Sequence, residues 1–141
     1  MDNTLENWIK FHEGYRSFPY TDTVGKLTIG YGRNLSDKGI SFDEAMVLLR
    51  NDISSCTKEL STFMWYNEQP PHVKDALVNM CFNLGLTNLL KFKRMIKALE
   101  KKDYTTAAKE ALDSKWATQV PNRAKDIALV MRQGFAHDAQ A

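Results

Sequence analysis

The sequence has little cysteine or proline and no long apolar run, and each shortage excludes a class of protein. Its 141 residues include 2 cysteines and 4 prolines, too few for a disulfide-stapled scaffold or a proline-rich low-complexity chain. No apolar run approaches the roughly 18 residues of a membrane-spanning helix. Hydrophobic residues make up 43% and charged residues 26%. We therefore expect a single globular domain over residues 1–141 with a core of ordinary size.

Complete motifs for phosphate, metal and nucleophilic serine chemistry are also missing. Gly30-x-Gly32 lacks the third glycine of a dinucleotide fingerprint, and Gly25-Lys26 lacks the Ser or Thr that ends a phosphate loop. The cysteines and histidines show no metal-ligand spacing; they are Cys56, Cys81, His12, His72 and His137. We predict no metal and no cofactor, and we expect both cysteines to be buried thiols on apolar helical stripes.

Positive charge is concentrated in one short stretch of an almost neutral chain. Residues 1–70 carry 7 Lys/Arg against 10 Asp/Glu, and residues 71–141 carry 12 against 7. The range 91–102 contains six basic residues and one acidic residue. Such a helix face would attract an anionic polymer or surface, although a solvated lysine face without a function is an equally good interpretation. No helix-turn-helix or zinc signature accompanies it, so we predict no nucleic-acid partner.

Helix caps and β-forming residues divide the first half of the chain. A capping box at Asn3-x-x-Glu6 and apolar spacing predict a helix that ends at Gly14. From 18 to 31 the chain is rich in β-formers interrupted at 22–25, which predicts a hairpin continued into a short third strand. A second capping box at Ser41-x-x-Glu44 opens an apolar stripe that predicts a helix of about 20 residues.

The second half of the chain reads as helical throughout. Proline and glycine signals predict helices over 71–84, 92–99, 103–112 and 121–132. The predicted fold class is α+β and mostly α. It consists of a small β-hairpin N-lobe at about 13–60, including a long connecting helix, and a helical C-lobe at about 61–141 joined by the N-terminal helix.

Three polar residues around the predicted hairpin suggest acid–base chemistry. Glu13 ends a helix, where the negative dipole end and the neighbouring Phe11 and Phe18 favour the protonated acid, a proton donor. Asp22 lies in a turn, where backbone N–H groups and water favour the ionised form. Thr28 would place a hydroxyl across the turn from Asp22. Taken singly, each has an ordinary structural alternative: a solvated helix-end Glu, an Asx-turn, a β-forming Thr.

Together these residues form a recognisable pattern. The segments Glu13-Gly14-x-Arg16 and Tyr20-x-Asp22-x-x-Gly25-x-x-Thr28-Ile29-Gly30-x-Gly32 resemble the active-site segment of phage-type lysozymes, glycoside hydrolase family 24. The ranges 79–85 and 114–125 resemble C-lobe segments of the same family. The resemblance extends over nearly the whole chain and implies a lysozyme-like two-lobe fold. Between 34 and 41 the chain is too short for an additional N-lobe helix of larger relatives.

The resemblance also implies roles for individual residues. Glu13 matches the general acid, Asp22 the carboxylate that activates or orients water, and Thr28 the hydroxyl that helps to hold that water. Arg123 matches a C-lobe arginine that pairs with the catalytic glutamate. The remaining matches are two substrate-facing cleft positions and a buried tryptophan: Phe82, Asn83 and Trp116.

The implied function is that of an endolysin. Such an enzyme hydrolyses the β-1,4 bond between N-acetylmuramic acid and N-acetylglucosamine in peptidoglycan, with inversion, and lyses the host cell. The acidic N-terminus lacks signal-peptide features, so we expect the protein to accumulate in the host cytoplasm. We also expect a monomer. It would reach the wall in the periplasm after a holin-like protein permeabilises the membrane.

Two alternatives remain from the sequence. A lytic transglycosylase needs the acid but no water-activating carboxylate, and the presence of both Asp22 and Thr28 argues against it. A wall-binding or membrane-disrupting protein would act without catalysis through the basic 91–102 helix.

Overall fold

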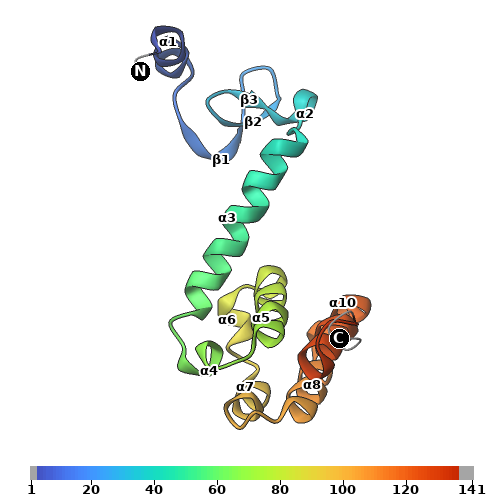
Figure 1. The fold of residues 1–141 in the computed structure, drawn as a ribbon. Coiled ribbons are helices and arrows are strands. Elements are labelled where there is room, and N and C mark those ends of the chain that lie inside the picture. Colours follow the sequence, from blue (N-terminus) through green and yellow to red (C-terminus); the bar gives the residue numbers. More distant parts are fainter. Residues whose placement is uncertain (1–2, 137–141) are drawn as a thin grey trace. The chain divides into compact units, whose positions relative to one another are not determined.

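The structure is a computed structural model that describes residues 3–136 and is mostly helical, with one small sheet (Figure 1). The elements are α1 (Thr4–Glu13), β1 (Arg16–Thr21), β2 (Leu27–Gly30), β3 (Arg33–Asn34), α2 (Leu35–Lys38), α3 (Phe42–Leu60), α4 (Met64–Asn67), α5 (Pro71–Leu84), α6 (Leu86–Leu89), α7 (Lys93–Glu100), α8 (Tyr104–Leu112), α9 (Lys115–Gln119) and α10 (Pro121–Gln133). This architecture confirms the predicted α+β class.

The chain divides into two compact units, residues 1–48 (unit 1) and 49–141 (unit 2). Helix α3 begins in unit 1 and continues into unit 2. The lobe boundary near residue 60 and the grouping of the N-terminal helix with the C-lobe stay predictions.

Unit 1 contains a three-stranded antiparallel sheet in the order β1-β2-β3. The register places Thr28 opposite Tyr20 on β1 and opposite Asn34 on β3, so Thr28 occupies the central strand. Its side chain is only 3% exposed, whereas the neighbouring Leu27 is 45% exposed. These two neighbours point to opposite faces of the sheet. The strand order β1-β2-β3 confirms the predicted hairpin with a short third strand.

Helix boundaries follow the caps that the sequence predicts. Asn3 accepts the backbone N–H of Glu6 through its side chain at 2.9 Å. Ser41 and Glu44 form a reciprocal capping box, in which each side chain accepts the backbone N–H of the other residue. These local bonds satisfy backbone donors that the first helical turn leaves unpaired, which is why α1 and α3 begin where they do.

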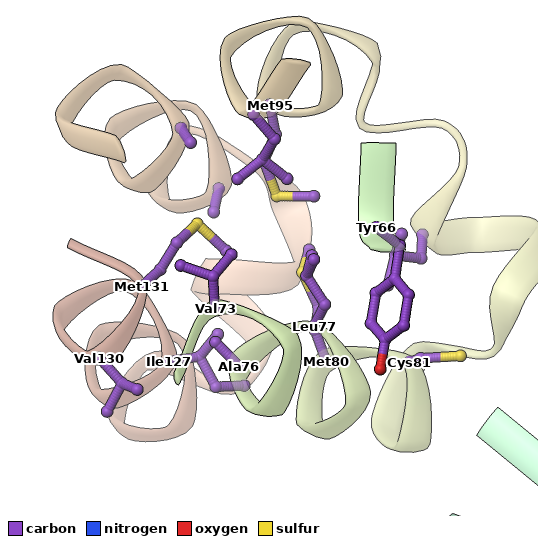
Figure 2. Packing of buried hydrophobic residues seen from close by; sticks show 14 of the residues in the cluster. Tyr66, Val73, Ala76, Leu77, Met80, Cys81, Met95, Ile127, Val130 and Met131 are labelled. Carbon is purple, nitrogen blue, oxygen red and sulfur yellow. The ribbon is translucent and has the colours of Figure 1, made fainter. Parts of the chain in front are cut away.

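Unit 2 encloses the hydrophobic core. Helix α10 packs against α5 and α8, and α7 packs against α8. In Figure 2, Val73 of α5 lies beside Met131 of α10, and Ala76 of α5 lies beside Ile127 of α10. Val73, Leu77 and Met131 are completely buried. Burying a large aliphatic side chain contributes about 1.5–3 kcal/mol relative to leaving it exposed, so this cluster supplies much of the folding free energy of unit 2.

Several short features differ from the sequence prediction. Helix α3 has 19 residues, close to the predicted 20, but the short helices α4, α6 and α9 were not predicted. The segment between 34 and 41 does hold a helix, but α2 is a single turn. Cys81 is buried as predicted, whereas Cys56 is only partly buried, so the prediction for Cys56 is wrong. No helix in the described part of the chain is both long and apolar enough to cross a membrane.

Candidate active site

Glu13 is placed by the end of α1 and contacts Gly32. The helix stops because Gly14 adopts a positive φ of 70° and donates its N–H to the carbonyl of Lys10. The Glu13 carboxylate then lies against Gly32, so closely that a Cβ on residue 32 would collide with Oε2 and lie 2.8 Å from Cδ. Gly32 itself has a φ of 75°. A residue without a side chain is therefore required beside the candidate acid on both conformational and steric grounds.

Asp22 and Thr28 are both held by the backbone N–H and carbonyl of Lys26. One carboxylate oxygen of Asp22 accepts the backbone N–H groups of Val24 at 3.0 Å and of Lys26 at 2.8 Å. The Lys26 carbonyl accepts the Asp22 N–H at 2.9 Å and the Thr28 hydroxyl at 3.0 Å. The turn therefore brings these two predicted residues to a common anchor.

The expected apolar neighbourhood of Glu13 is not provided by the two phenylalanines. Phe11 and Phe18 are 82% and 80% exposed. The Glu13 carboxylate lies against Gly32 instead. Glu13 occupies the space that a side chain on Gly32 would fill, while nothing lies within 4 Å of a Cβ built on Gly30.

An ion pair fastens β3 to the first turn of α3 near this site. Both terminal nitrogens of Arg33 donate to the Glu44 carboxylate, at 2.7 and 2.5 Å, and one also donates to the Gly39 carbonyl. The hydrogen bond from Arg33 is the main reason why the pKa of Glu44 falls to about 2, with a further contribution from the Ser41 N–H. Such a bidentate pair fixes orientation as well as charge.

Within unit 2, two of the other predicted residues line one groove. Phe82 and Arg123 border a hollow of about 330 Å³ between α3, α5 and α10. Arg123 donates through Nε to the Asn79 side chain at 2.9 Å and through a terminal nitrogen to the Asn79 carbonyl at 3.4 Å. Its pairing with Glu13 stays a prediction, because Glu13 belongs to unit 1.

Asn83 contacts the predicted buried tryptophan. The Trp116 indole donates to the Asn83 side-chain oxygen at 2.8 Å. Trp116 is 4% exposed and meets the Phe92 ring edge-on at 6.0 Å, which confirms that it is a core residue. This bond fixes the orientation of the Asn83 amide at the surface of α5.

The described residues hold no group of three or more Asp, Glu, His or Cys side chains placed to bind a metal ion. His137, one of the three histidines considered above, lies outside the described residues.

Comparisons with known proteins give consistent matches over most of the chain. Residues 10–133 match the family model described as phage lysozyme. The chain is 30% identical over 167 residues to "Probable T4-type lysozyme 2" of Dictyostelium discoideum, covering 95% of this chain and 96% of that protein. The values for "Probable T4-type lysozyme 1" of the same organism are 30% over 166 residues, with the same coverage. "Pre-baseplate central spike protein Gp5" of Enterobacteria phage T4 is 23% identical over 161 residues, which is 93% of this chain and 28% of that protein.

These matches define the class of protein. It is an enzyme of the lysozyme type, a glycosidase with muramidase activity toward peptidoglycan. More specifically, the chain belongs to the phage lysozyme family.

Three features of the site were missed by the sequence interpretation. The contact of Glu13 with Gly32 joins positions 19 residues apart, so no local pattern reports it. The use of Lys26 as an anchor is a backbone property and leaves no signature in the residue type. The Arg123–Asn79 bond had a signal, because both residues lie in the segments that resemble the family.

Proposed function

We propose that this protein is an endolysin that hydrolyses the β-1,4 bond between N-acetylmuramic acid and N-acetylglucosamine by acid–base catalysis with inversion. The observation that carries the proposal is the shared anchoring of Asp22 and Thr28 on the Lys26 peptide groups. Phe82 and Asn83 would contact the glycan, and Arg123 would support Glu13.

The hydrogen-bond directions at this anchor suit a nucleophilic water. The Thr28 hydroxyl donates its only proton to the Lys26 carbonyl. It can therefore only accept a hydrogen bond from a water molecule. An ionised Asp22 is also an acceptor. A water held by both would donate its two protons to them and direct its lone pairs outward, which is the polarity needed for attack on an anomeric carbon.

Glu13 would supply the other half of the reaction. As a carboxylic acid it would donate its proton to the glycosidic oxygen while the water attacks from the opposite face of the sugar, and Asp22 would take a proton from that water. The steric requirement at Gly32 then has a catalytic reason, because it fixes the acid in one place.

The stereochemistry of the product tests this assignment. A β-linked glycan cleaved with inversion releases the α-anomer first. Proton NMR of the initial reducing end should therefore show the α-anomer before mutarotation. A β-anomer in the first spectra would refute the water-holding role of Asp22 and Thr28.

The two alternatives are separated by mass spectrometry of the same digest. Hydrolysis adds one water per cleaved bond, whereas a lytic transglycosylase leaves anhydro-sugar ends. We expect hydrated ends from the wild type and no turnover from Asp22→Ala. Anhydro ends would favour the transglycosylase, and an undigested glycan would favour a non-catalytic wall-binding protein.

Host lysis is tested by release of the enzyme. An endolysin synthesised in the host cytoplasm reaches the periplasm only when a holin-like protein opens the inner membrane. We expect cells that express the chain to remain turbid until chloroform is added and then to lyse. Cells expressing Glu13→Gln should stay turbid in chloroform, and rapid lysis without any membrane lesion would contradict the proposed route.

A further inference from the structure

Two thiols that the proposed reaction does not use face each other inside unit 2. Cys56 lies on α3 and Cys81 on α5, 25 residues apart in the sequence. Both are free, and the Cys56 side chain is a hydrogen-bonding neighbour of the Cys81 thiol. In Figure 2 the Cys81 sulfur lies at the edge of the buried cluster, on the side opposite Met131.

The surroundings of the two cysteines are consistent with this juxtaposition. Ile53 and Val78, which precede Cys56 and Cys81 by three residues, border the same groove. Leu60, one turn after Cys56, is completely buried in the cluster that contains Cys81, and Cys56 packs against that cluster. Each cysteine thus lies one helical turn after a residue that borders this groove, Cys56 after Ile53 and Cys81 after Val78.

We propose that Cys56 and Cys81 are a site of reversible disulfide formation, with an exogenous disulfide such as oxidised glutathione as the oxidant. The Cys56 thiolate attacks one sulfur of the oxidant, the oxidant's S–S bond breaks, and one glutathione thiolate leaves. The Cys81 thiolate then attacks the Cys56 sulfur and displaces the second glutathione thiolate. Two protons pass to solvent, and the two electrons lost by the cysteines reduce the oxidant.

The order of these steps follows from burial. Cys81 is 1% exposed, so an external disulfide cannot reach it in the native protein, while Cys56 is partly exposed. Burial, and then the adjacent Cys56 thiol and the Glu59 carboxylate, raise the pKa of Cys81 to about 12. Its thiolate is therefore scarce, and closure of the disulfide is the slower step.

A disulfide here would join α3 to α5 and close a loop of about 25 residues, which restricts the unfolded chain. For a domain of this size we expect oxidation to raise the thermal midpoint by roughly 10 °C. This inference concerns the stability of unit 2 and does not depend on the proposed function.

The test uses the full chain incubated with oxidised glutathione under native conditions, followed by mass spectrometry and non-reducing peptide mapping. The wild type should lose two hydrogens, retain no glutathione and yield one cross-linked peptide pair. Cys81→Ala should retain one glutathione on Cys56. Cys56→Ala should not react until it is unfolded in urea, a result that does not require the Cys81 variant to fold.

Two outcomes would overturn the proposal. One is a wild type that keeps glutathione on Cys56 as Cys81→Ala does, because Cys81 would then be unable to close the bond. The other is native Cys56→Ala reacting as fast as the wild type. The rise in thermal midpoint should likewise occur only in the wild type and disappear after reduction with dithiothreitol.

Discussion

Unit 1 and unit 2 are each stabilised internally by a different kind of interaction. The buried apolar cluster of the described residues lies entirely in unit 2, on helices α3 to α10. The ion pairs found among the described residues, Glu6–Lys10, Lys26–Asp37 and Arg33–Glu44, all lie in unit 1. Unit 1 relies on a three-stranded sheet, caps and charged contacts, and it carries all three candidate catalytic residues.

This difference means that one unit supplies most of the folding free energy and the other unit positions the candidate catalytic residues. Apolar burial is non-directional and tolerates small shifts, whereas hydrogen bonds fix donors and acceptors at defined positions. A unit built on hydrogen bonds can therefore orient Asp22 and Thr28, and a unit with a large core can supply the free energy of folding. Changes in the two units should affect different measured quantities.

The largest effect on activity is expected from Glu13→Gln. The amide keeps the shape of the side chain but cannot donate a proton, so the rate of peptidoglycan hydrolysis should fall by about 10² to 10⁴. The thermal midpoint should stay within the range of a surface substitution. Glu6→Gln, on the same helix, is the control and should retain full activity; a Glu13→Gln enzyme with a tenth of wild-type activity would exclude Glu13 as the acid.

The largest effect on stability is expected from Leu77→Ala. Leu77 is completely buried in the core of unit 2, so its truncation should lower the free energy of unfolding by about 2–5 kcal/mol. Activity per folded molecule should not change at temperatures below the transition. Leu129→Ala, 45% exposed on α10, is the matched control and should cost less than about 1 kcal/mol. Equal costs for the two variants, measured in urea, would contradict this description of the core.

Gly32→Ala should affect both quantities and thus sharpen the comparison. The positive φ at residue 32 predicts a loss of about 1–2 kcal/mol, and the new Cβ would displace the Glu13 carboxylate. Misplacing a catalytic group by about 1 Å can cost about 10²-fold in rate. Gly39→Ala has the same backbone requirement, with a φ of 60°, and open space around its Cβ. The Gly39→Ala variant should lose stability but keep its activity. Equal activity losses in Gly32→Ala and Gly39→Ala would mean that the contact of Glu13 with Gly32 is unimportant.

The smallest effect is expected from the Arg33–Glu44 pair. The pKa of folded Glu44, about 2, lies below its ordinary value of 4.5. Ionised Glu44 therefore stabilises the folded state fully above about pH 4.5, and this contribution is lost as the pH falls from there toward 2. The thermal midpoint of the wild type should exceed that of Glu44→Gln at pH 6, and the gap should close toward pH 2 and narrow in 1 M salt. A constant gap would show that the charge is not involved.

Much of this fold was predictable because its signals are local. Asn3, Ser41 and Asp103 each cap a helix through bonds that span three residues, and Gly14 and Gly134 end helices through their own positive φ. Helices α4 and α6 were missed because neither has a side-chain cap and each is a single turn. Helix α9 had a readable signal, since Ser114 accepts the backbone N–H of Ala117.

The candidate site was predictable in composition but not in geometry. Residue types and spacing were enough to select Glu13, Asp22 and Thr28. The contact of Glu13 with Gly32 depends on how α1 meets the end of the sheet, which is a tertiary property. The exposure of Phe11 and Phe18 has the same origin, because sequence neighbours of Glu13 need not surround its carboxylate.

The anchor at Lys26 also determines which mutations this enzyme can accept. Three of the bonds that organise the turn use the N–H and the carbonyl of residue 26, and none of them uses its side chain. Any amino acid with a backbone N–H can provide these bonds, and only proline cannot. The Lys26 side chain makes a separate contact, the exposed ion pair with Asp37 at 3.2 Å, so a substitution at residue 26 should remove that pair and leave the anchor in place. Many different residues at position 26 would therefore keep the anchor. The importance of the position for the site would show only when proline is introduced there.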